Sequence, residues 1–358
     1  MGGWKKGIEE ECGGPPPAAT PAVFPFLQPG SIRRFAGVSA SVEVPSVTVI
    51  IPTRPGQSTI LALEGAKKLD YPPERLEILV VRGRQPAVQR NAALRVARGE
   101  LIYFLDDDAV ARPDNLRRAL GHFNAPPVKM LGGPNLCPAA APALERVFAV
   151  VLSSWVAFVS SRARYDAVGS IRPTNEKELI LCNLMARRDD VLALGGFDES
   201  LYPNEENALM DQLQTRGAQL IYDPEFFVHR RPRPTLRAFC RMLMTYGRGR
   251  AEQFRRHPTP GSALNFAPPL FCVYLLAALA LGWWMGPLVF LPLAVYLLAV
   301  FVQTAWSSIR HGLGRSLAAA PLVILTHVLY GVGFWRGLFT ELGRGSKSAA
   351  HEVTVERF

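Results

Sequence analysis

The feature that most constrains this chain is a long stretch without a charged side chain. No Asp, Glu, Lys or Arg occurs from His257 to Ser308. This run of about 50 residues is enough for two helices, since a helix needs about 20 apolar residues to cross a bilayer. The sequence GWWMGP at 282–287 predicts a turn between them, and a second uncharged stretch, Ser316 to Trp335, predicts a third crossing. The alternative is a buried helical hairpin, but soluble cores seldom contain such long charge-free runs.

Basic residues next to this run indicate which side of the membrane holds the rest of the chain. Nine arginines and one acid, Glu252, lie between Arg230 and Arg256. Cytoplasmic flanks of membrane helices carry an excess of Lys and Arg, so this segment is expected in the cytoplasm. It contains no nucleic-acid-binding module. We therefore expect membrane lipids with anionic head groups or a phosphate-bearing lipid as its partners, and no nucleic acid.

The two ends of the chain have simpler sequences. Residues 1–44 include GGPPPAATPAVFPF and lack a signal-peptide pattern, so they are expected to form a poorly ordered tail. Residues 341–358 are expected to form a C-terminal tail, which three crossings would place outside the cell. The five cysteines have no paired spacing, which argues against a disulfide framework or a zinc site and fits a reducing cytosol.

Residues 45–230 alternate between apolar runs and stretches with helical spacing. SVTVIIPT, LEILVVRG and ELIYFLDDD are typical of buried strands, and QSTILALEGAKKL and AVQRNAALRVA are typical of helices. This order predicts an α/β domain with a mostly parallel sheet and helices on both faces. Ligands of such sheets bind at the carboxyl ends of the strands.

Three consecutive aspartates follow one of these strands. Side chains at i and i+2 of an extended segment point the same way, so Asp106 and Asp108 are expected to converge while Asp107 turns aside. Two such carboxylates suit a hard divalent cation, Mg²⁺ or Mn²⁺, which keeps positions open for phosphate oxygens. The alternative is a solvated acidic turn before the helix RPDNLRRAL, for which Asp114 is a better N-cap.

Together these segments resemble the family-two glycosyltransferases, inverting enzymes with a GT-A fold that bind nucleotide sugars. The resemblance covers nearly all of residues 45–235 and is carried by VTVIIPTRPG, QRNAALRVARGELIYFLDDDA and ILCNLMARRDDVLALGGFDES. It implies an α/β, Rossmann-like GT-A domain followed by C-terminal transmembrane helices. MTYGRGRAEQFRRHP and THVLYGVGFWRGLF further resemble the succinoglycan-type branch, which extends lipid-linked oligosaccharides for bacterial exopolysaccharide.

The resemblance implies donor-side roles for individual residues. It places the nucleotide base at Pro52 and Thr53 and makes Asp106 and Asp108 the Asp-x-Asp pair for the ribose and the metal-bound diphosphate. The donor-binding residues that it implies are Pro52, Thr53, Arg54, Arg82, Arg90, Asn91, Asp106 and Asp107. The implied metal ligands are Asp106, Asp108 and His229.

The resemblance also implies a catalytic carboxylate pair and an acceptor side. Glu205 and Glu206 match the family's Glu-Asp pair, and Glu206 is expected to be the general base for the incoming hydroxyl. The alternative is that both acids only stabilise the positive N-terminal end of the helix NALMDQLQTRG. The implied acceptor-binding residues are Asn183, Gly196, Phe197, Asp198, Arg248 and Arg250.

Two positions depart from the family pattern. The second strand ends in VVRGRQ, so Arg82 stands where relatives have an acid that contacts the nucleotide. Glu206 stands for the usual Asp and is one methylene longer. The Gln-x-x-Arg-Trp signature of processive synthases is absent, which predicts the transfer of one sugar per encounter.

The resemblance, together with the apolar C-terminal segments, thus implies a membrane-bound, inverting, nucleotide-sugar-dependent hexosyltransferase. Its expected acceptor is a polyprenyl-diphosphate-linked glycan of exopolysaccharide or cell-surface synthesis, at the bacterial inner membrane, with a multi-pass anchor and a cytoplasmic catalytic domain. Two alternatives are a transferase for a polyprenyl monophosphate or another glycolipid, and a non-catalytic sugar-binding scaffold on a degenerate GT-A fold. The expected parts are a tail (1–44), a GT-A domain (45–230), a basic membrane-interface segment (231–263), transmembrane helices (264–340) and a second tail (341–358).

Overall fold

The computed structural model describes residues 44–201, 204–258, 260–341 and 352–358. Nearly all of the expected N-terminal tail, 1–44, and most of the expected C-terminal tail, 341–358, lie outside these ranges. Everything below concerns the described residues.

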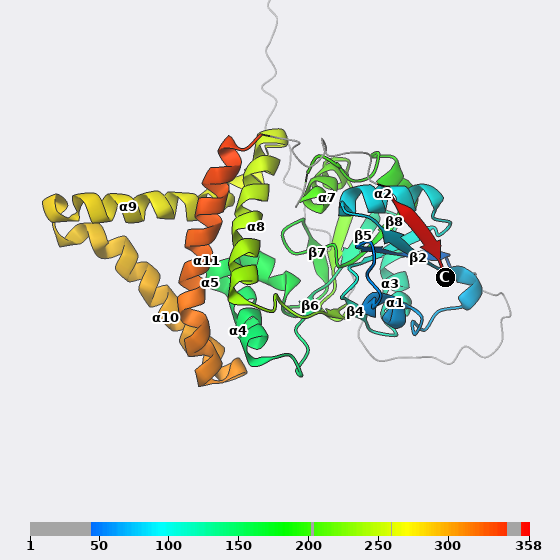
Figure 1. Cartoon of the computed structure of the whole chain (residues 1–358), viewed down its shortest axis with the longest axis horizontal. Coiled ribbons are helices and arrows are strands. Elements are labelled where there is room, and N and C mark those ends of the chain that lie inside the picture. The colour runs from blue at the N-terminus through cyan, green and yellow to red at the C-terminus, as the bar shows by residue number, and fades with distance from the viewer. Residues whose placement is uncertain (1–43, 202–203, 259, 342–351) are drawn as a thin grey trace, which may run out of the picture. The chain divides into compact units, whose positions relative to one another are not determined.

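An eight-stranded sheet, in the order β11-β2-β1-β3-β8-β5-β9-β7, forms the centre of the α/β part (Figure 1). Its strands are β1 (Val47–Thr53), β2 (Leu76–Arg82), β3 (Leu101–Leu105), β5 (Val128–Gly132), β7 (Arg172–Thr174), β8 (Asn183–Arg187), β9 (Gln219–Tyr222) and β11 (Thr354–Arg357). β1 runs parallel to β2 and β3, as predicted, but β8 is antiparallel to both β3 and β5. The sheet is therefore mixed. The expectation of a mostly parallel sheet is wrong for the pairings of β8 with β3 and β5.

Helices cover both faces of the sheet because successive residues of its buried strands point to opposite sides. On one face α1 (Leu61–Ala66) and α3 (Asn115–Phe123) share a core with Val49 and Ile51 of β1. On the other face α2 (Pro86–Val96), α6 (Arg188–Leu192) and α7 (Glu205–Thr215) share a core with Ile50. Every residue of β1 is buried, which is why this strand has a continuous apolar sequence.

A second, three-stranded sheet lies beside the carboxyl ends of these strands. Its strands are β4 (Val110–Ala111), β6 (Asn135–Leu136) and β10 (Val228–His229), with β10 in the middle. β10 pairs antiparallel with β4. The segment after the three aspartates is thus joined to the segment before the arginine-rich block, residues Arg230 to Arg256. A short turn of helix, η1 (Pro73–Arg75), leads into β2.

The C-terminal third of the chain is helical. It contains α8 (Leu236–Arg256), η3 (Pro260–Phe266), α9 (Ala267–Met285), η4 (Pro287–Phe290), α10 (Leu291–His311) and α11 (Leu313–Phe339). In the described part of the chain, the segments Ser262–Gly282, Pro287–His311 and Leu313–Phe339 are long and apolar enough to cross a membrane. Large apolar side chains such as Leu279 and Ile309 are about four-fifths exposed, which suits lipid rather than water.

The basic helix α8 packs along α11 (Figure 1). Glycines allow the close approach: a Cβ atom on Gly247 would lie 2.0 Å from the carbonyl oxygen of Tyr330, and one on Gly333 would lie 2.1 Å from that of Met244. Larger residues at these glycines would push the two helices apart.

A third hydrophobic core joins the C-terminal helices to a segment that the sequence assigns to the α/β domain. This segment comprises α4 (Ala143–Leu152), α5 (Trp155–Phe158) and η2 (Val159–Arg164). Phe148 of α4 stacks on Phe239 of α8 with ring centroids 4.3 Å apart, and both side chains are fully buried. Ala143–Leu152 and Trp155–Arg164 together could form a fourth, bent apolar span.

The end of the chain returns to the sheet. Thr354–Arg357 forms β11, which pairs antiparallel with β2 at the sheet edge. The sequence led us to expect a tail here, because a four-residue strand at a chain end has no distinctive pattern. β11 therefore belongs to the same sheet as β1 and β2, although the apolar helices separate it from them in the sequence.

Candidate active site

The carboxyl ends of β1, β2 and β3, here called the carboxyl edge, bring together the predicted donor-side residues. Pro52 and Thr53 end β1, Arg82 ends β2 in register with Thr53, and Asp106 directly follows β3. Pro52 is buried within its strand, whereas Arg54 is exposed. This is the edge at which parallel strands bind ligands.

Asp106 and Asp108 share one partner, Arg230. Arg230 Nη1 lies 3.1 Å from Asp106 Oδ2, and its Nε donates a hydrogen bond to Asp108 Oδ1 at 2.6 Å. Asp107 instead accepts a hydrogen bond from Thr53 Oγ1 at 3.0 Å. The i and i+2 carboxylates thus converge and the middle one faces away.

Arg90 of α2 connects Asp106 to Glu205. Its guanidinium donates to Asp106 Oδ1 at 3.0 Å and to Glu205 Oε1 at 3.2 Å, and its side chain is only 5% exposed. Burial alone would raise the pKa of Asp106, but the guanidinium groups of Arg230 and Arg90 hold this pKa below its usual value. Asp106 is therefore ionised at neutral pH.

Glu205 and Glu206 form the first turn of α7 and have different surroundings. Burial and the neighbouring Glu206 carboxylate raise the pKa of Glu205 to about 8. Glu205 Oε2 is buried and has no hydrogen-bond partner among the described residues. Glu206 is only half-buried, so of the two carboxylates it is the one that a bound molecule can reach.

The predicted acceptor-side turn is attached to α2. Asn91 Nδ2 donates to the carbonyl oxygen of Phe197 at 2.9 Å, and the Phe197 amide donates to Asn91 Oδ1 at 2.9 Å. Gly196 has a φ of +85°, and a Cβ atom there would lie 2.4 Å from Asn91 Oδ1, so only glycine fits. Asp198 lies 3.7 Å from Arg256 of α8. Asn91, Gly196 and Phe197 hold α2, and with it Arg90, in place.

Asn183, which the resemblance places on the acceptor side, lies inside the fold. Its side chain is completely buried, and its Oδ1 accepts a hydrogen bond from Tyr103 Oη at 2.8 Å. Its Nδ2 donates to the carbonyl oxygen of Phe226 at 2.6 Å. In the structure this residue links β8 to β3 and to the loop before β10, and its acceptor contact stays a prediction.

The carboxyl edge fits a small, hard cation with two protein ligands. Mg²⁺ is commonly held by one or two carboxylates together with substrate phosphates, and Asp106 and Asp108 supply that pair. His229 is exposed, and its ring packs 5.3 Å from that of Phe227. In the described ranges no three His, Cys, Asp or Glu side chains lie close enough to hold a metal, so the predicted three-ligand set with His229 is not assembled.

Arg248 and Arg250, predicted together on the acceptor side, face different sides of α8. Arg250 Nη2 lies 3.4 Å from Asn207 Oδ1 on α7, the helix that begins with the two glutamates. Arg164 of η2 donates to the same oxygen at 2.7 Å. Arg248 lines a cavity against α11 instead. Of these two arginines, only Arg250 contacts α7, the helix that begins with Glu205 and Glu206.

Sequence reasoning missed Arg230 and the partner of Arg82. Arg230 belongs to the arginine-rich block that was assigned to the membrane flank, although three adjacent carboxylates in a basic chain call for a nearby cation. Arg82 Nε donates to Glu356 Oε1 of β11 at 2.5 Å. No local signal indicates a contact between positions so far apart in the sequence.

Comparison with known proteins gives consistent results. Residues 101–335 match the glycosyl transferase family group 2, and residues 49–136 match glycosyl transferase family 2. A pre-mycofactocin glycosyltransferase of Mycobacterium tuberculosis is 26% identical over 284 residues, which cover 70% of this chain and 56% of that protein. The succinoglycan biosynthesis protein ExoA of Rhizobium meliloti is 30% identical over 149 residues, 41% of this chain and 44% of that protein. The chain spans about half the length of these curated relatives.

Among solved structures, the fold is similar to that of the mannosyltransferase PcManGT from Pyrobaculum calidifontis, which was solved in complex with GDP-Man and Mn²⁺. The TM-score is 0.51 at 18% sequence identity, over 82% of this chain and 87% of that one. This similarity confirms the predicted GT-A fold.

Proposed function

The chain belongs to glycosyl transferase family group 2, and from this premise we propose that it moves one sugar from a nucleotide-diphosphate sugar to a polyprenyl-diphosphate-linked acceptor. The observation that carries the proposal is the convergence of Asp106 and Asp108 at the carboxyl edge, with Arg90 and Arg230 beside them. Such an edge can receive the diphosphate of a nucleotide sugar.

The donor diphosphate is the group that must leave, so its charge has to be neutralised. Asp106 and Asp108 would hold Mg²⁺ or Mn²⁺, which supplies Lewis-acid stabilisation of the leaving diphosphate. Arg230, which contacts both carboxylates, would supply a second positive charge for the diphosphate. Arg90, fixed by Glu205 and the Asn91 turn, keeps Asp106 ionised and oriented.

Glu206 is the proposed general base. The acceptor oxygen forms a bond to the anomeric carbon while the bond from that carbon to the diphosphate oxygen breaks, and the hydroxyl proton passes to Glu206. Glu206 suits this step because it is more accessible than Glu205. Arg250 and Arg164, on the same side of α7, are proposed to bind the acceptor phosphate.

The apolar helices support a lipid-linked acceptor, and the likeness to a succinoglycan biosynthesis protein supports a role in exopolysaccharide or cell-surface glycan synthesis. We place the catalytic domain on the cytoplasmic side of a bacterial inner membrane, because the arginine-rich flank adjoins the first apolar helix. A second candidate acceptor is one like pre-mycofactocin, since that relative matches over most of this chain.

Radiolabelled sugar nucleotides and a bacterial lipid extract test the acceptor. Detergent-purified protein is expected to transfer label to material that partitions into an organic solvent and releases its glycan on mild acid, as lipid diphosphates do. A labelled product that stays in the aqueous phase and forms only when pre-mycofactocin is added would instead favour the second candidate. A polyprenyl monophosphate that becomes labelled without any preformed glycan would favour that simpler acceptor.

A further inference from the structure

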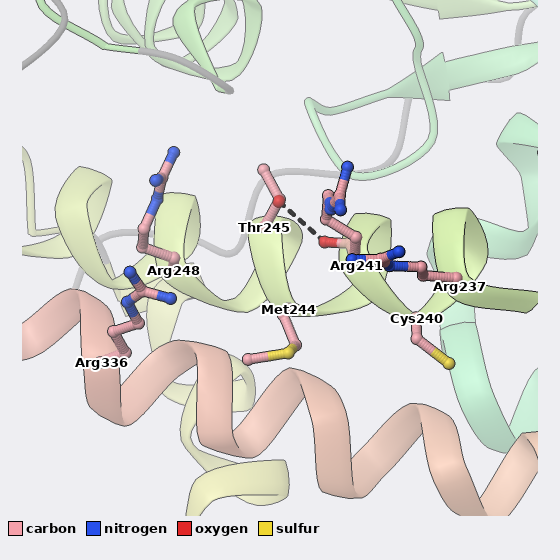
Figure 2. A pocket seen from close by; sticks show the side chains of 7 residues that line it. All are labelled: Arg237, Cys240, Arg241, Met244, Thr245, Arg248 and Arg336. Atoms are coloured by element: carbon pink, nitrogen blue, oxygen red, sulfur yellow. Dashed lines mark hydrogen bonds between the residues drawn. The ribbon is translucent and has the colours of Figure 1, made fainter.

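A cavity of about 340 Å³ lies against α8 and α11, on the side of α8 that faces away from Arg250. Figure 2 shows its lining of four arginines and three smaller side chains: Arg237, Cys240, Arg241, Met244, Thr245, Arg248 and Arg336. Six of them come from α8 at positions that share one side of the helix, and Arg336 comes from the last turns of α11.

Positive charge at this cavity is only partly balanced. Arg248 lies 3.4 Å from Glu252 on its own helix. Within the ranges that the structure describes, no carboxylate forms an ion pair with Arg237, Arg241 or Arg336. Guanidinium groups present several donors in a planar fork that matches phosphate oxygens, so a phosphate is the anion that this arrangement favours.

The surroundings of Arg336 indicate where the phosphate comes from. Val332, Trp335 and Phe339, all within one turn of Arg336, are 45%, 37% and 82% exposed. The weakly polar sulfur-containing side chains of Met244 and Cys240 also line the cavity. Apolar surface beside a cluster of arginines suits a molecule with a phosphate head group and hydrocarbon chains. A free phosphate would make no contact with the apolar surface.

We propose that this cavity binds the phosphate head group of an anionic membrane phospholipid, at a site separate from the catalytic carboxylates. Bound lipid would hold α8 against the membrane surface and so fix the height of the α/β part above it. The site does not depend on the proposed transferase reaction.

Native mass spectrometry of the full chain in detergent can test this site with phosphatidylglycerol, phosphatidylcholine and glycerol 3-phosphate as probes. Phosphatidylglycerol is expected to bind, and the triple variant Arg237→Gln, Arg241→Gln, Arg336→Gln is expected to bind it roughly 100-fold more weakly, since each arginine near an anionic lipid surface contributes several-fold. Arg315→Gln is the matched control, because Arg315 is also exposed on α11 but lies outside the cavity.

Three outcomes would overturn the proposal. Equal affinity of the triple variant and the wild type for phosphatidylglycerol would show that the lipid binds elsewhere. Equal affinity for glycerol 3-phosphate and phosphatidylglycerol would show a site for soluble phosphates. Weakening by Arg315→Gln to the same extent would mean that net charge, not this cavity, attracts the lipid.

The pairing of β11 with β2 carries a second, independent inference. Arg82 at the end of β2 donates to both carboxylate oxygens of Glu356, at 2.5 and 3.4 Å. The same guanidinium donates through Nη1 to the carbonyl oxygen of Gln57 at 2.8 Å, in the loop that follows β1. The last strand of the chain is thus connected through Arg82 to a loop of the carboxyl edge.

We infer that Glu356 is a positioning residue for the donor nucleotide, acting through Arg82 on the loop around Gln57. This inference rests on the proposed function only in taking the carboxyl edge as the nucleotide site. Arg357 offers a matched control: it is next in sequence but points to the other face of the sheet, where its Nε lies 3.1 Å from Glu77.

Calorimetric titration with GDP and UDP in the presence of Mn²⁺ tests the inference. Glu356→Gln is expected to lower the nucleotide affinity roughly tenfold, which is the effect of losing one charge-assisted hydrogen bond. Glu356→Asp is expected to recover part of this affinity. Arg357→Gln is expected to leave the affinity within twofold of wild type.

The outcomes separate the inference from the proposed function. Unchanged nucleotide affinity in Glu356→Gln would overturn the inference alone. If Glu356→Gln and Arg357→Gln lower the nucleotide affinity and the melting temperature equally, β11 contributes only to the stability of the fold. A wild type that binds neither GDP, UDP nor any other nucleoside diphosphate would overturn both.

Discussion

Asp106 and Asp108 differ from Asp107 in the direction of their side chains, and this difference can be measured. Asp106→Ala and Asp108→Ala are expected to abolish metal-dependent nucleotide binding, because each removes one of the two carboxylates that share Arg230. Asp107→Ala is expected to be milder, since it removes only the hydrogen bond from Thr53. Titration with Mn²⁺ and nucleoside diphosphate distinguishes the three variants. Equal losses in all three, or full activity in excess chelator, would contradict the assignment.

Glu206→Gln tests the general base. It keeps the size of the side chain but removes its basicity, so turnover is expected to fall about 10²- to 10⁴-fold with little change in nucleotide affinity. Glu205→Gln is expected to cost less turnover and to raise the donor KM, because Glu205 acts through Arg90 on Asp106. Glu206→Asp should retain partial activity, since the carboxylate is withdrawn by one methylene. Near-normal turnover in Glu206→Gln would move the base to another acid.

For single residues, the sequence predicts contacts within a short segment but not contacts between residues far apart in the chain. The convergence of Asp106 and Asp108 could be predicted from three adjacent letters, although the chain makes a turn at Asp107 and Asp108 rather than the extended segment that the prediction assumed. Arg230 reaches the same carboxylates from far along the chain, and its position depends on how β10 pairs with β4. Composition alone does not separate it from the arginines that flank the membrane helices.

Among the secondary-structure elements, α3 is held to the end of β9 by a buried carboxylate. Asp223 accepts hydrogen bonds from Arg118 at 2.6 and 2.9 Å, lies 3.0 Å from His122 Nε2, and is fully buried. Burial alone would raise the pKa of Asp223, but hydrogen bonds from His122 and Arg118 lower it to about 2. This pKa lies below that of an unfolded aspartate, so Asp223 stabilises the fold above about pH 4, and the stabilisation is lost as the pH falls toward 2.

Asp223→Asn is therefore expected to lower the free energy of unfolding by about 2 kcal/mol at neutral pH, where the wild-type carboxylate is charged. Melting temperatures measured from pH 7 to pH 2 check this. The difference between variant and wild type should shrink toward pH 2. A difference that stays constant over this range would mean that packing, rather than charge, is what the variant lost.

The direction of strands shows a second limit of sequence reasoning. Continuous apolar runs such as those of β1 and β3 predict buried strands correctly, because both faces are covered. They contain no information on direction, so the antiparallel insertion of β8 between β3 and β5 was missed. The apolar helix α4 was missed for a similar reason: its pattern predicts burial but does not say against which core.

For the whole molecule, the return of the chain to β2 restricts how the apolar helices can cross a membrane. β11 and the α/β part lie on one side, so the number of complete crossings between residues 258 and 352 must be even. The apolar helices α9 and α10, each about 30 Å long by their residue count, can supply two crossings. We therefore expect α11 to lie along α8 at the membrane surface rather than to cross, and the two helices pack closely through glycines.

Cysteine labelling in intact cells tests this topology. Single cysteines introduced as Glu100→Cys and Glu352→Cys, two exposed positions before and after the apolar helices, are expected to stay unlabelled by a membrane-impermeant reagent until the inner membrane is opened. Labelling of position 352 but not position 100 from outside would mean three crossings. Labelling of both would reverse the orientation that the arginine-rich flank predicts.

The most direct test is a donor-panel assay on the detergent-purified chain, with bacterial lipid extract, with and without Mn²⁺. We predict that one nucleotide sugar is consumed in proportion to labelled lipid, that Mn²⁺ or Mg²⁺ is required, and that Asp108→Ala is inactive. A folded wild type that releases nucleotide from no member of the panel, or an Asp108→Ala variant as active as the wild type, would contradict a metal-assisted glycosyl transfer at the carboxyl edge.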